Sequence, residues 1–381
     1  MKQFNDARVI LDLLKRANDS YYNNAESIIS DSEYDTKKDQ LRDLYEKVLL
    51  PKKSVDQELV KEIEEFMIQV GAPVTASEWR KQIHKKQMTS LNKVNTEQEF
   101  KNWVSSINGS SFVIFDKMDG GSIDLVYSDS KLVQAITRGD GIEGEDIFQN
   151  VLKMKNVKSE IKGFSGNLKG EIVIVREDFE TLNEISERTY KNPRNTATGL
   201  SKSLDGVNVD LLSIYFYDID DDNKEFETEE EKMLQIESYS LKTCFWEKVN
   251  IQEAIEIFNQ YESSIRASLN YDIDGLVIRE NSISLQEQQG ELGGNPKAKI
   301  AWKFKPLQAK SKITYIEWHL GNSGRITPII HVEPTPIGGI TVQKMTGFNL
   351  DFFLNLKPYK DAILLFERAN DTVPIPLKIV E

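Results

Sequence analysis

The sequence predicts a multi-domain α+β protein, with a helical part at 1–75, an α+β part at 76–308 and a small β-barrel at 309–381. Three observations lead to this expectation. Apolar residues recur at helical spacing in the first part. Short β-rich runs alternate with helical ones in the second. The third holds short strands between glycine and proline turns, which is typical of small barrels.

The first part is expected to be helical throughout. VILDLLKRA (9–17) carries apolar residues at helical spacing. Ser30 and Glu33 form a capping-box pattern at the start of a second helix, and Tyr34 begins its apolar stripe. A proline and several lysines then break the pattern. Beyond them we expect a further helix at roughly 54–70.

Strands dominate the second and third parts. The second part also has helical segments near 97–106, 177–188 and 227–239. Its expected strands are SFVIF, SIDLVY, LVQAIT, LKGEIVIV, LSIYFYDI, IDGLVIR and KIAWKF. Those of the third part are KITYIEWHLG, RITPIIHVEP, ITVQKMTG and TVPIPLKIV. The order therefore favours a mixed domain followed by an all-β one.

Composition narrows the class of protein. Cys244 is the only cysteine, so neither an internal disulfide nor a cysteine-based zinc site can form. His84, His319 and His331 lie far apart in the sequence, and we interpret them as surface or core residues rather than metal ligands. No metal site made by the protein alone is predicted. No apolar run could span a membrane and no secretory pattern is present, so we expect a cytoplasmic protein without a membrane partner.

The net charge of −13 argues against nucleic acid as a partner, because cations on a protein supply most of its non-specific affinity. The charge is uneven, however. Residues 218–232 hold nine acids and two lysines, and we interpret this run as a solvated loop and helix start. Residues 309–381 hold eight lysines and arginines against seven acids. The total therefore does not exclude a locally basic groove.

Lys117 is the candidate nucleophile. A lysine amine attacks only after it has lost its proton, which burial or nearby cations favour. Asp119 lies two residues on, so the two side chains share one face of a strand. Gly120 and Gly121 then permit a tight turn and close approach of a ligand. Taken alone, K-x-D-G also fits a surface strand that ends in a hairpin turn.

Charged residues recur in the apolar strands and glycine-rich loops that follow. Such residues are costly in a strand unless they are paired or face a ligand. They are Arg138 in TRGDG, Glu171 in LKGEIVI, Arg194 in KNPRNTATG, Lys202, Asp274 in YDIDG and Lys303 in IAWKF. Several cations near one lysine suit a reaction that passes a phosphoryl group through a lysine adduct.

With these residues the chain resembles the NAD-dependent DNA ligases of the nucleotidyltransferase superfamily. KMDG resembles their adenylated-lysine motif, and TRGDG with GED, KGE, NPRNTATG, DIDG and WKF follow in the family's order. QMTSLNKV (87–94) resembles the segment that contacts adenine, which implies Ser90 and Leu91 as contacts. LGNSGRITPIIHVEPTPIGGITVQKMTGFN (320–349) and RANDTVPIP (368–376) resemble the start and end of an OB-fold.

The resemblance implies a helical NAD-recognition domain, a nucleotidyltransferase (adenylation) domain and an OB-fold over the three ranges given above. SYYNNAESIISDSEYD (20–35) resembles the NAD-specific segment, and aromatic faces suit a cationic nicotinamide ring. The implied contacts to the nicotinamide mononucleotide half are Tyr21, Tyr22, Asp31, Tyr34 and Asp35. Without the resemblance, Tyr34 would read as a core residue of a capped helix.

The resemblance also implies a reaction: nick sealing in DNA replication and repair through a lysyl-AMP intermediate. Lys117 would be the nucleophile, and Asp119 would orient the 3′-hydroxyl or a divalent ion. The implied contacts to phosphates, ribose or metal are Arg138, Glu171, Arg194, Lys202, Asp274 and Lys303, with Arg279 as a further cofactor contact. The implied cofactors are NAD and Mg²⁺, and the implied partner is nicked double-stranded DNA.

Three positions depart from the family pattern. Phe115 stands where the family has a glutamate that contacts adenine. Arg279 replaces a strand lysine, and a regular strand would place it on the opposite face from Asp274 unless a bulge intervenes. Asn322 stands where an arginine is expected in the OB-fold.

Family members typically continue with zinc, helix-hairpin-helix and BRCT modules. We expect either a compact ligase or an adenylating chain whose partner subunit supplies the missing modules, and the acidic charge favours the second. Two alternatives stay open. One is an ATP-dependent DNA or RNA ligase with the same core, against which the tyrosine- and aspartate-bearing segment at 21–35 speaks. The other is a largely inactive DNA-binding subunit that needs a partner.

Overall fold

The structure is a computed structural model. It describes residues 2–23, 29, 31–45, 57–68, 79–320, 326–337, 340–369 and 373–380. The chain divides into two compact units, Met1–Ile28 with Lys37–Phe304 and Ile29–Thr36 with Lys305–Glu381. Each unit is described by itself, and the three-part division at 75 and 308 stays a prediction.

The N-terminal helices agree with the sequence pattern. They are α1 (Lys2–Asn23), α2 (Asp31–Leu44) and α3 (Gln57–Ile68). Apolar residues at helical spacing are buried on α1 (Leu11 and Leu14) and on α3 (Leu59 and Ile63), and these two helices contact each other. Ser30 of the expected capping box lies outside the described residues.

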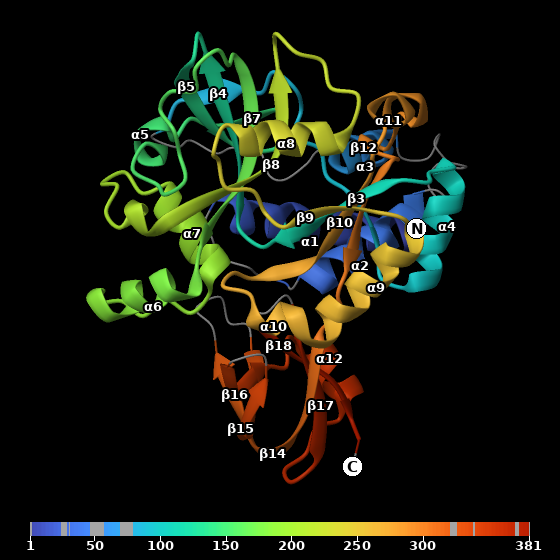
Figure 1. Cartoon of the computed structure of the whole chain (residues 1–381). Coiled ribbons are helices and arrows are strands. Elements are labelled where there is room, and N and C mark those ends of the chain that lie inside the picture. The colour runs from blue at the N-terminus through green and yellow to red at the C-terminus, as the bar shows by residue number, and fades with distance from the viewer. Residues whose placement is uncertain are drawn as a thin grey trace. The chain divides into compact units, whose positions relative to one another are not determined.

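Two sheets form the framework of the larger unit, and Figure 1 shows helix α8 beside strand β8 of the second. The five-stranded sheet has the order β2 (Asn92–Val94), β13 (Lys299–Lys303), β10 (Ile273–Glu280), β3 (Phe112–Met118) and β9 (Trp246–Val249). The four-stranded sheet has the order β5 (Lys131–Thr137), β4 (Gly121–Ser128), β7 (Gly166–Ile174) and β8 (Leu212–Asp221). All seven expected strands are present. Consecutive strands β3 and β4 belong to different sheets, so residues 119–120 join the two.

The remaining elements surround these sheets. Short strand pairs are β1 (Lys81–Ile83) with β6 (Glu143–Glu145) and β11 (Glu291–Leu292) with β12 (Asn295–Pro296). The helices are α4 (Glu97–Ile107), α5 (Phe148–Val151), α6 (Arg176–Ile185), α7 (Pro193–Ser201), α8 (Glu229–Ser238), α9 (Ile251–Gln260), α10 (Arg266–Ser268) and α11 (Ile283–Gln289). The three expected helices correspond to α4, α6 and α8.

Helix α7 was not expected, because its sequence NPRNTATG is rich in residues typical of loops. The side chain of Asn192 accepts a hydrogen bond from the backbone N–H of Asn195, and Pro193 occupies the first turn. Asparagine at the cap and proline just inside it favour a helix start, so the same residues that suggest a loop begin a helix here.

The core of the larger unit is contiguous across both sheets. Trp302 of β13 is its largest fully buried side chain. The ring of Phe258 from α9 stacks on it at 3.9 Å between centroids, and that of Phe100 from α4 at 4.4 Å. Because β10 lies next to β13, this aromatic cluster supports the strand that carries Asp274.

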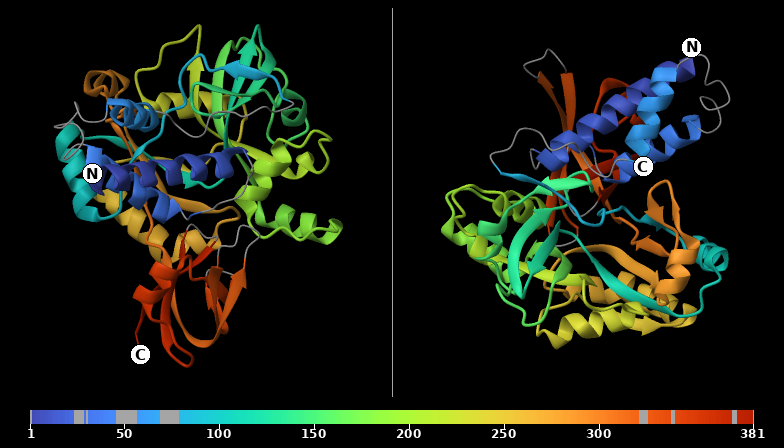
Figure 2. Two further views of the ribbon diagram at one scale, coloured as in Figure 1. Left: turned by 180° about the vertical axis from the view of Figure 1, so that it is seen from behind. Right: turned by 90° about the horizontal axis from the view of Figure 1, so that it is seen from above.

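The C-terminal unit has the β-barrel character that the sequence predicts, and Figure 2 shows its strands from two further directions. Its antiparallel order is β16 (Ile340–Thr346), β15 (Ile326–Ile337), β14 (Leu307–Leu320), β17 (Ile363–Ala369) and β18 (Val373–Ile379), with helix α12 (Leu350–Leu356). The sheet curls so that its outermost strands, β16 and β18, contact each other, which gives an OB-like half-barrel. Asn322 and Arg325 lie outside the described residues.

Candidate active site

Lys117 and Asp274 face each other where β3 meets β10. Lys117 pairs with Gly275, and the register shifts between Ile273 and Gly275, so Asp274 lies in a bulge. The bulge turns Asp274 to the face of Lys117, and Nζ of the lysine lies 2.8 Å from Oδ1 of the aspartate. The sequence had required a bulge of this kind if Asp274 and Arg279 were to face one ligand.

A second lysine contacts the same carboxylate. Lys303 of β13 lies opposite Gly275, with its Nζ 3.7 Å from Oδ2 of Asp274. Burial raises the pKa of Asp274, but the charges of Lys117 and Lys303 outweigh it and bring the pKa to about 2. Asp274 is therefore ionised between two lysines. The side chain of Lys117 remains 27% exposed.

The link between the two sheets carries the next pair. Asp119 forms an ion pair with Arg194 of α7, and both side chains are largely buried. A side chain at Gly120 would overlap the backbone carbonyl oxygen of Ile172 in β7. Glycine is thus needed here for close packing of the backbone, whereas the sequence suggested a turn and a ligand contact.

Glu171 brings the second sheet into the site. Its Oε2 accepts a hydrogen bond of 2.8 Å from Ser122, which lies directly opposite on β4. Burial raises the pKa of Glu171, while the hydrogen bond from Ser122 and the positive charges of Arg194, Lys117 and Arg138 lower it. Cations from strand β3, helix α7 and the loop after β5 therefore act on one carboxyl group. Sequence reasoning missed Ser122, because only the register of β4 against β7 identifies it.

Arg138 and Lys202 are held by Ser90, before strand β2, and by Glu145 of strand β6. The guanidinium of Arg138 donates a hydrogen bond of 2.8 Å to Oγ of Ser90. Nζ of Lys202 lies 2.9 Å from Oε2 of the buried Glu145. Leu91 is half-buried. The segment expected to contact adenine thus lies next to the loop that carries Arg138.

Arg279 lies on the same face as Lys117, farther along the sheet. Its guanidinium stacks on the Phe115 ring, 4.4 Å from the centroid. It donates hydrogen bonds to the backbone oxygen of Tyr217 at 3.1 Å and to Glu229 at 2.9 Å. Phe115 therefore supports the arginine that replaces the family's lysine, which accounts for the two departures together.

The acidic run at 218–232 is partly buried, so its interpretation as a solvated loop is wrong at Asp218 and Glu229. Lys232 lies 2.9 Å from Asp218, and Lys299 lies 3.0 Å from Glu229. Burial raises the pKa of Glu229, but Lys299 and Arg279 outweigh it and bring the pKa to about 2. Lys232 comes from the run itself, but Arg279 and Lys299 come from distant strands, which local charge patterning does not reveal.

Of the five residues expected to contact the nicotinamide mononucleotide half, only Tyr34 has a side chain in the described part of the chain. Tyr34 is half-buried. The side chains of Tyr21, Tyr22, Asp31 and Asp35 lie outside the described part of the chain. Within that part, no group of three or more histidine, cysteine, aspartate or glutamate side chains is placed to hold a metal, and no helix is both long and apolar enough to cross a membrane.

Comparisons with known proteins show which family the chain resembles. The family model for the NAD-dependent DNA ligase adenylation domain matches residues 76–307. A DNA ligase of Sorangium cellulosum (strain So ce56) is 31% identical over 93% of this chain and 53% of its own length. A DNA ligase of Francisella tularensis subsp. novicida (strain U112) is 31% identical over 97% of this chain and 55% of its own length. The chain thus spans about half the length of these curated relatives.

Among solved structures, one described as Pmar-Lig_Pre. is similar to 77% of this chain over 67% of its own, with a TM-score of 0.45 and 13% sequence identity.

Proposed function

The chain belongs to the family of NAD-dependent DNA ligase adenylation domains, and from that premise we propose that it forms a lysyl-AMP at Lys117 and passes the adenylate to the 5′-phosphate of a DNA nick. The observation that carries this proposal is the partly exposed side chain of Lys117, whose amine pairs with the ionised Asp274 and lies near the further cations Lys303 and Arg194.

The residues around Lys117 fit such a transfer. Nζ would attack the adenylyl phosphorus of NAD: a nitrogen–phosphorus bond forms, the bond to the bridging oxygen breaks, and nicotinamide mononucleotide leaves. The amine loses its proton to solvent, since the side chain is partly exposed. Asp274 accepts a hydrogen bond from Nζ and would direct the amine at the phosphorus.

The surrounding charges would bind the nucleotide. Arg138, Arg194, Lys202 and Lys303 would stabilise phosphate oxygens in the transition state, and Glu171 would bind the ribose. Asp119, once released from Arg194, would orient the 3′-hydroxyl in the sealing step. The five tyrosine and aspartate contacts from the N-terminal segment would bind the nicotinamide mononucleotide half.

We propose Mg²⁺ as the metal. Each carboxylate of the site already has a cation or hydroxyl partner: Asp119 has Arg194, Asp274 has Lys117, and Glu171 has Ser122. The described residues thus offer no cage of their own. Mg²⁺ suits a site in which substrate phosphates supply most ligands, together with one or two carboxylates and water.

An experiment with the full chain tests the proposal. The chain is incubated with Mg²⁺ and either labelled NAD or labelled ATP, and the product is then added to a nicked duplex. We expect label on the protein and a sealed strand with NAD alone. An adduct formed only from ATP would contradict the cofactor. An adduct from NAD without sealing would limit the function to adenylation and would indicate a partner subunit.

A further inference from the structure

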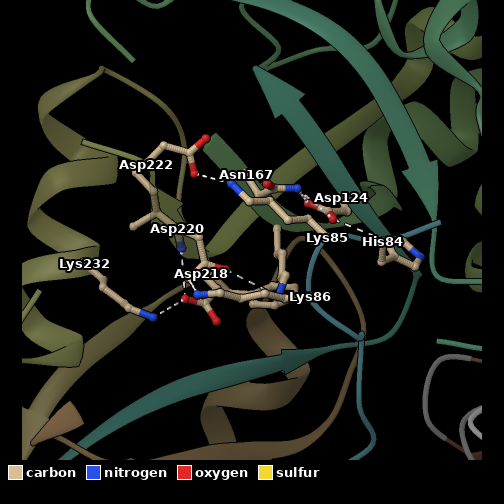
Figure 3. A network of polar contacts seen from close by, with 12 residues as sticks. His84, Lys85, Lys86, Asp124, Asn167, Asp218, Asp220, Asp222 and Lys232 are labelled. Carbon is tan, nitrogen blue, oxygen red and sulfur yellow. Dashed lines mark hydrogen bonds and ion pairs between the residues drawn. The ribbon is translucent and has the colours of Figure 1, made fainter. Parts of the chain in front are cut away.

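His84 is a buried histidine that has no part in the chemistry described so far. It follows β1 directly, and its side chain is completely shielded from solvent. Its Nδ1 lies 3.3 Å from Oδ2 of Asp124, which is buried in the middle of the four-stranded sheet. Asn167 donates to both oxygens of that carboxylate, at 3.0 Å each. Figure 3 shows these three side chains together.

The other ring nitrogen faces the glycine-rich loop. Nε2 of His84 lies 3.2 Å from the backbone oxygen of Thr137 and 3.2 Å from that of Arg138. Carbonyl oxygens only accept, so Nε2 carries a hydrogen and donates to them. Nδ1 lies within hydrogen-bond distance of the Asp124 carboxyl group. Asp124 and Asn167 thus fix both the orientation of the ring and the donor that faces the loop.

The chain around His84 follows the same loop over several residues. The backbone N–H of His84 donates to the oxygen of Ile142, and that of Met88 to the oxygen of Gly141, both at 2.9 Å. Strand β1 pairs with β6 beyond the loop. Ser90 accepts the hydrogen bond from the Arg138 guanidinium. One continuous segment, 81–90, therefore contacts Arg138 twice: His84 binds its backbone oxygen and Ser90 binds its guanidinium.

The loop needs such support because of its backbone. Gly139 has a φ of 56° and Gly141 a φ of 91°, so the loop passes through conformations open mainly to glycine. Glycines lose more conformational freedom on folding than other residues, and external hydrogen bonds must offset that loss. The carbonyl of Arg138 accepts one hydrogen bond from within the loop, from the N–H of Gly141 at 2.9 Å, and one from outside it, from His84 at 3.2 Å.

We propose that His84 is a positioning residue of the adenylation site: oriented by Asp124 and Asn167, it holds the loop at 137–141 so that Arg138 is directed toward the nucleotide. This inference rests on the proposed function, because it assumes that Arg138 binds the nucleotide. It assigns no chemistry to His84, which is buried and acts through Arg138.

Lysines in the same segment provide a comparison. Figure 3 shows Lys85 and Lys86 beside Asp222 and Asp220, with which they form ion pairs. Both lysine side chains are more than half exposed, at 57% and 65%. Exposed ion pairs contribute little to stability. If any contact between segment 81–90 and the rest of the unit sufficed to hold the loop, substitution of His84 and of Lys85 would affect NAD binding to a similar extent.

The test compares two substitutions of His84. In His84→Gln the amide nitrogen reaches the position of Nε2 and can still donate to the loop. In His84→Asn the shorter amide can reach Asp124 but not the loop. We expect His84→Asn to raise the KM for NAD in adduct formation about tenfold, roughly what loss of one to two hydrogen bonds causes. His84→Gln should retain most of the affinity, and Lys85→Ala should be nearly unchanged.

A double-mutant cycle separates positioning from folding. In the background of Arg138→Ala, His84→Asn should have little further effect, because the residue through which it acts is gone. Full additivity of the two losses would overturn the proposal, as would equal KM values for His84→Asn and the parent protein.

Hydrogen exchange gives a second readout that does not depend on activity. Without nucleotide, amides at 139–145 should exchange faster in His84→Asn than in the parent, in His84→Gln or in Lys85→Ala. Unchanged exchange in His84→Asn would refute the holding role even if KM rose. If the parent protein formed no adduct, the proposed function would fail, while the exchange experiment would still decide whether His84 orders the loop.

Discussion

Asp116, the neighbour of the proposed nucleophile, makes stability depend on pH in a way that a single substitution should remove. Its side chain is buried and accepts a hydrogen bond of 2.7 Å from the hydroxyl of Tyr271. Burial raises the pKa of Asp116 from an ordinary value of 3.8 to about 6, although the hydrogen bond from Tyr271 lowers it. At pH values between these two, the Asp116 carboxyl group therefore carries a proton in the folded protein but has lost it in the unfolded chain.

The magnitude follows from the two pKa values of Asp116, 3.8 and about 6. Each pKa unit corresponds to about 1.4 kcal/mol, so the shift is worth about 3 kcal/mol. Between pH 3.8 and 6 the folded state binds more protons than the unfolded state. The contribution of Asp116 to the free energy of unfolding therefore falls as pH rises. Asp116→Asn lacks this contribution. Between pH 4 and pH 7, the free energy of unfolding of the variant should therefore rise by about 2 kcal/mol relative to that of the parent.

Chemical denaturation of both proteins across this pH range measures the difference directly. The pH dependence matters more than the absolute value, since a changed hydrogen bond to Tyr271 would shift all points equally. Asp12→Asn, at an exposed position of α1, is the matched control and should show no such trend. A stability difference between Asp116→Asn and the parent that stays constant from pH 4 to 7 would refute the reasoning.

Two further predictions concern stability, one at a buried ion pair and one at a tightly packed glycine. Arg279→Met should lower the free energy of unfolding by about 3 kcal/mol, because the buried Glu229 loses one of its cations; urea denaturation measures it, and a neutral effect would mean that Lys299 alone suffices. Gly120→Ala should cost about 2 kcal/mol, because its Cβ would overlap the backbone of β7. Gly199→Ala in α7 is its control: an added Cβ there meets no described heavy atom within 4 Å, so the change should be neutral or stabilising.

Much of the architecture was predictable because strands and amphipathic helices leave local patterns. All seven expected strands of the α+β part are present, and the curled C-terminal sheet agrees with the expected barrel. Proline, as at Pro374 and Pro376, is disfavoured inside a sheet because it lacks an N–H donor. Strand β18 lies at one end of the strand order, where proline is tolerated. Strand β17 was not expected, although it pairs with both β14 and β18.

The candidate site was predictable in its residues but not in its geometry. Alternation along a strand put Asp274 and Arg279 on opposite faces, and only the register shift at Ile273 and Gly275 brings Asp274 to Lys117. Long-range pairing decides such bulges, so a single sequence cannot locate them. For the same reason, the contact between the Phe115 ring and the Arg279 guanidinium could not be predicted from the sequence.

Buried polar groups were the least predictable feature. His84 was correctly interpreted as a core or surface residue, but its partners Asp124 and Asn167 come from β4 and β7, far away in the sequence. Asp218 and Glu229 belong to a run that resembles solvated sequence. The polar partners of His84 and Glu229 come from elements far away in the sequence, so local composition does not identify them.

The most direct test of the account is the identity of the residue that receives the adenylate. The full chain is exposed to NAD and Mg²⁺, its intact mass is measured, and the modified peptide is identified. We predict one AMP on Lys117, none in Lys117→Ala, and formation about 100-fold slower in Asp274→Asn, which misplaces the amine. Lys101→Ala, at an exposed lysine of α4, should react like the parent. An adduct that persists in Lys117→Ala would contradict the central claim.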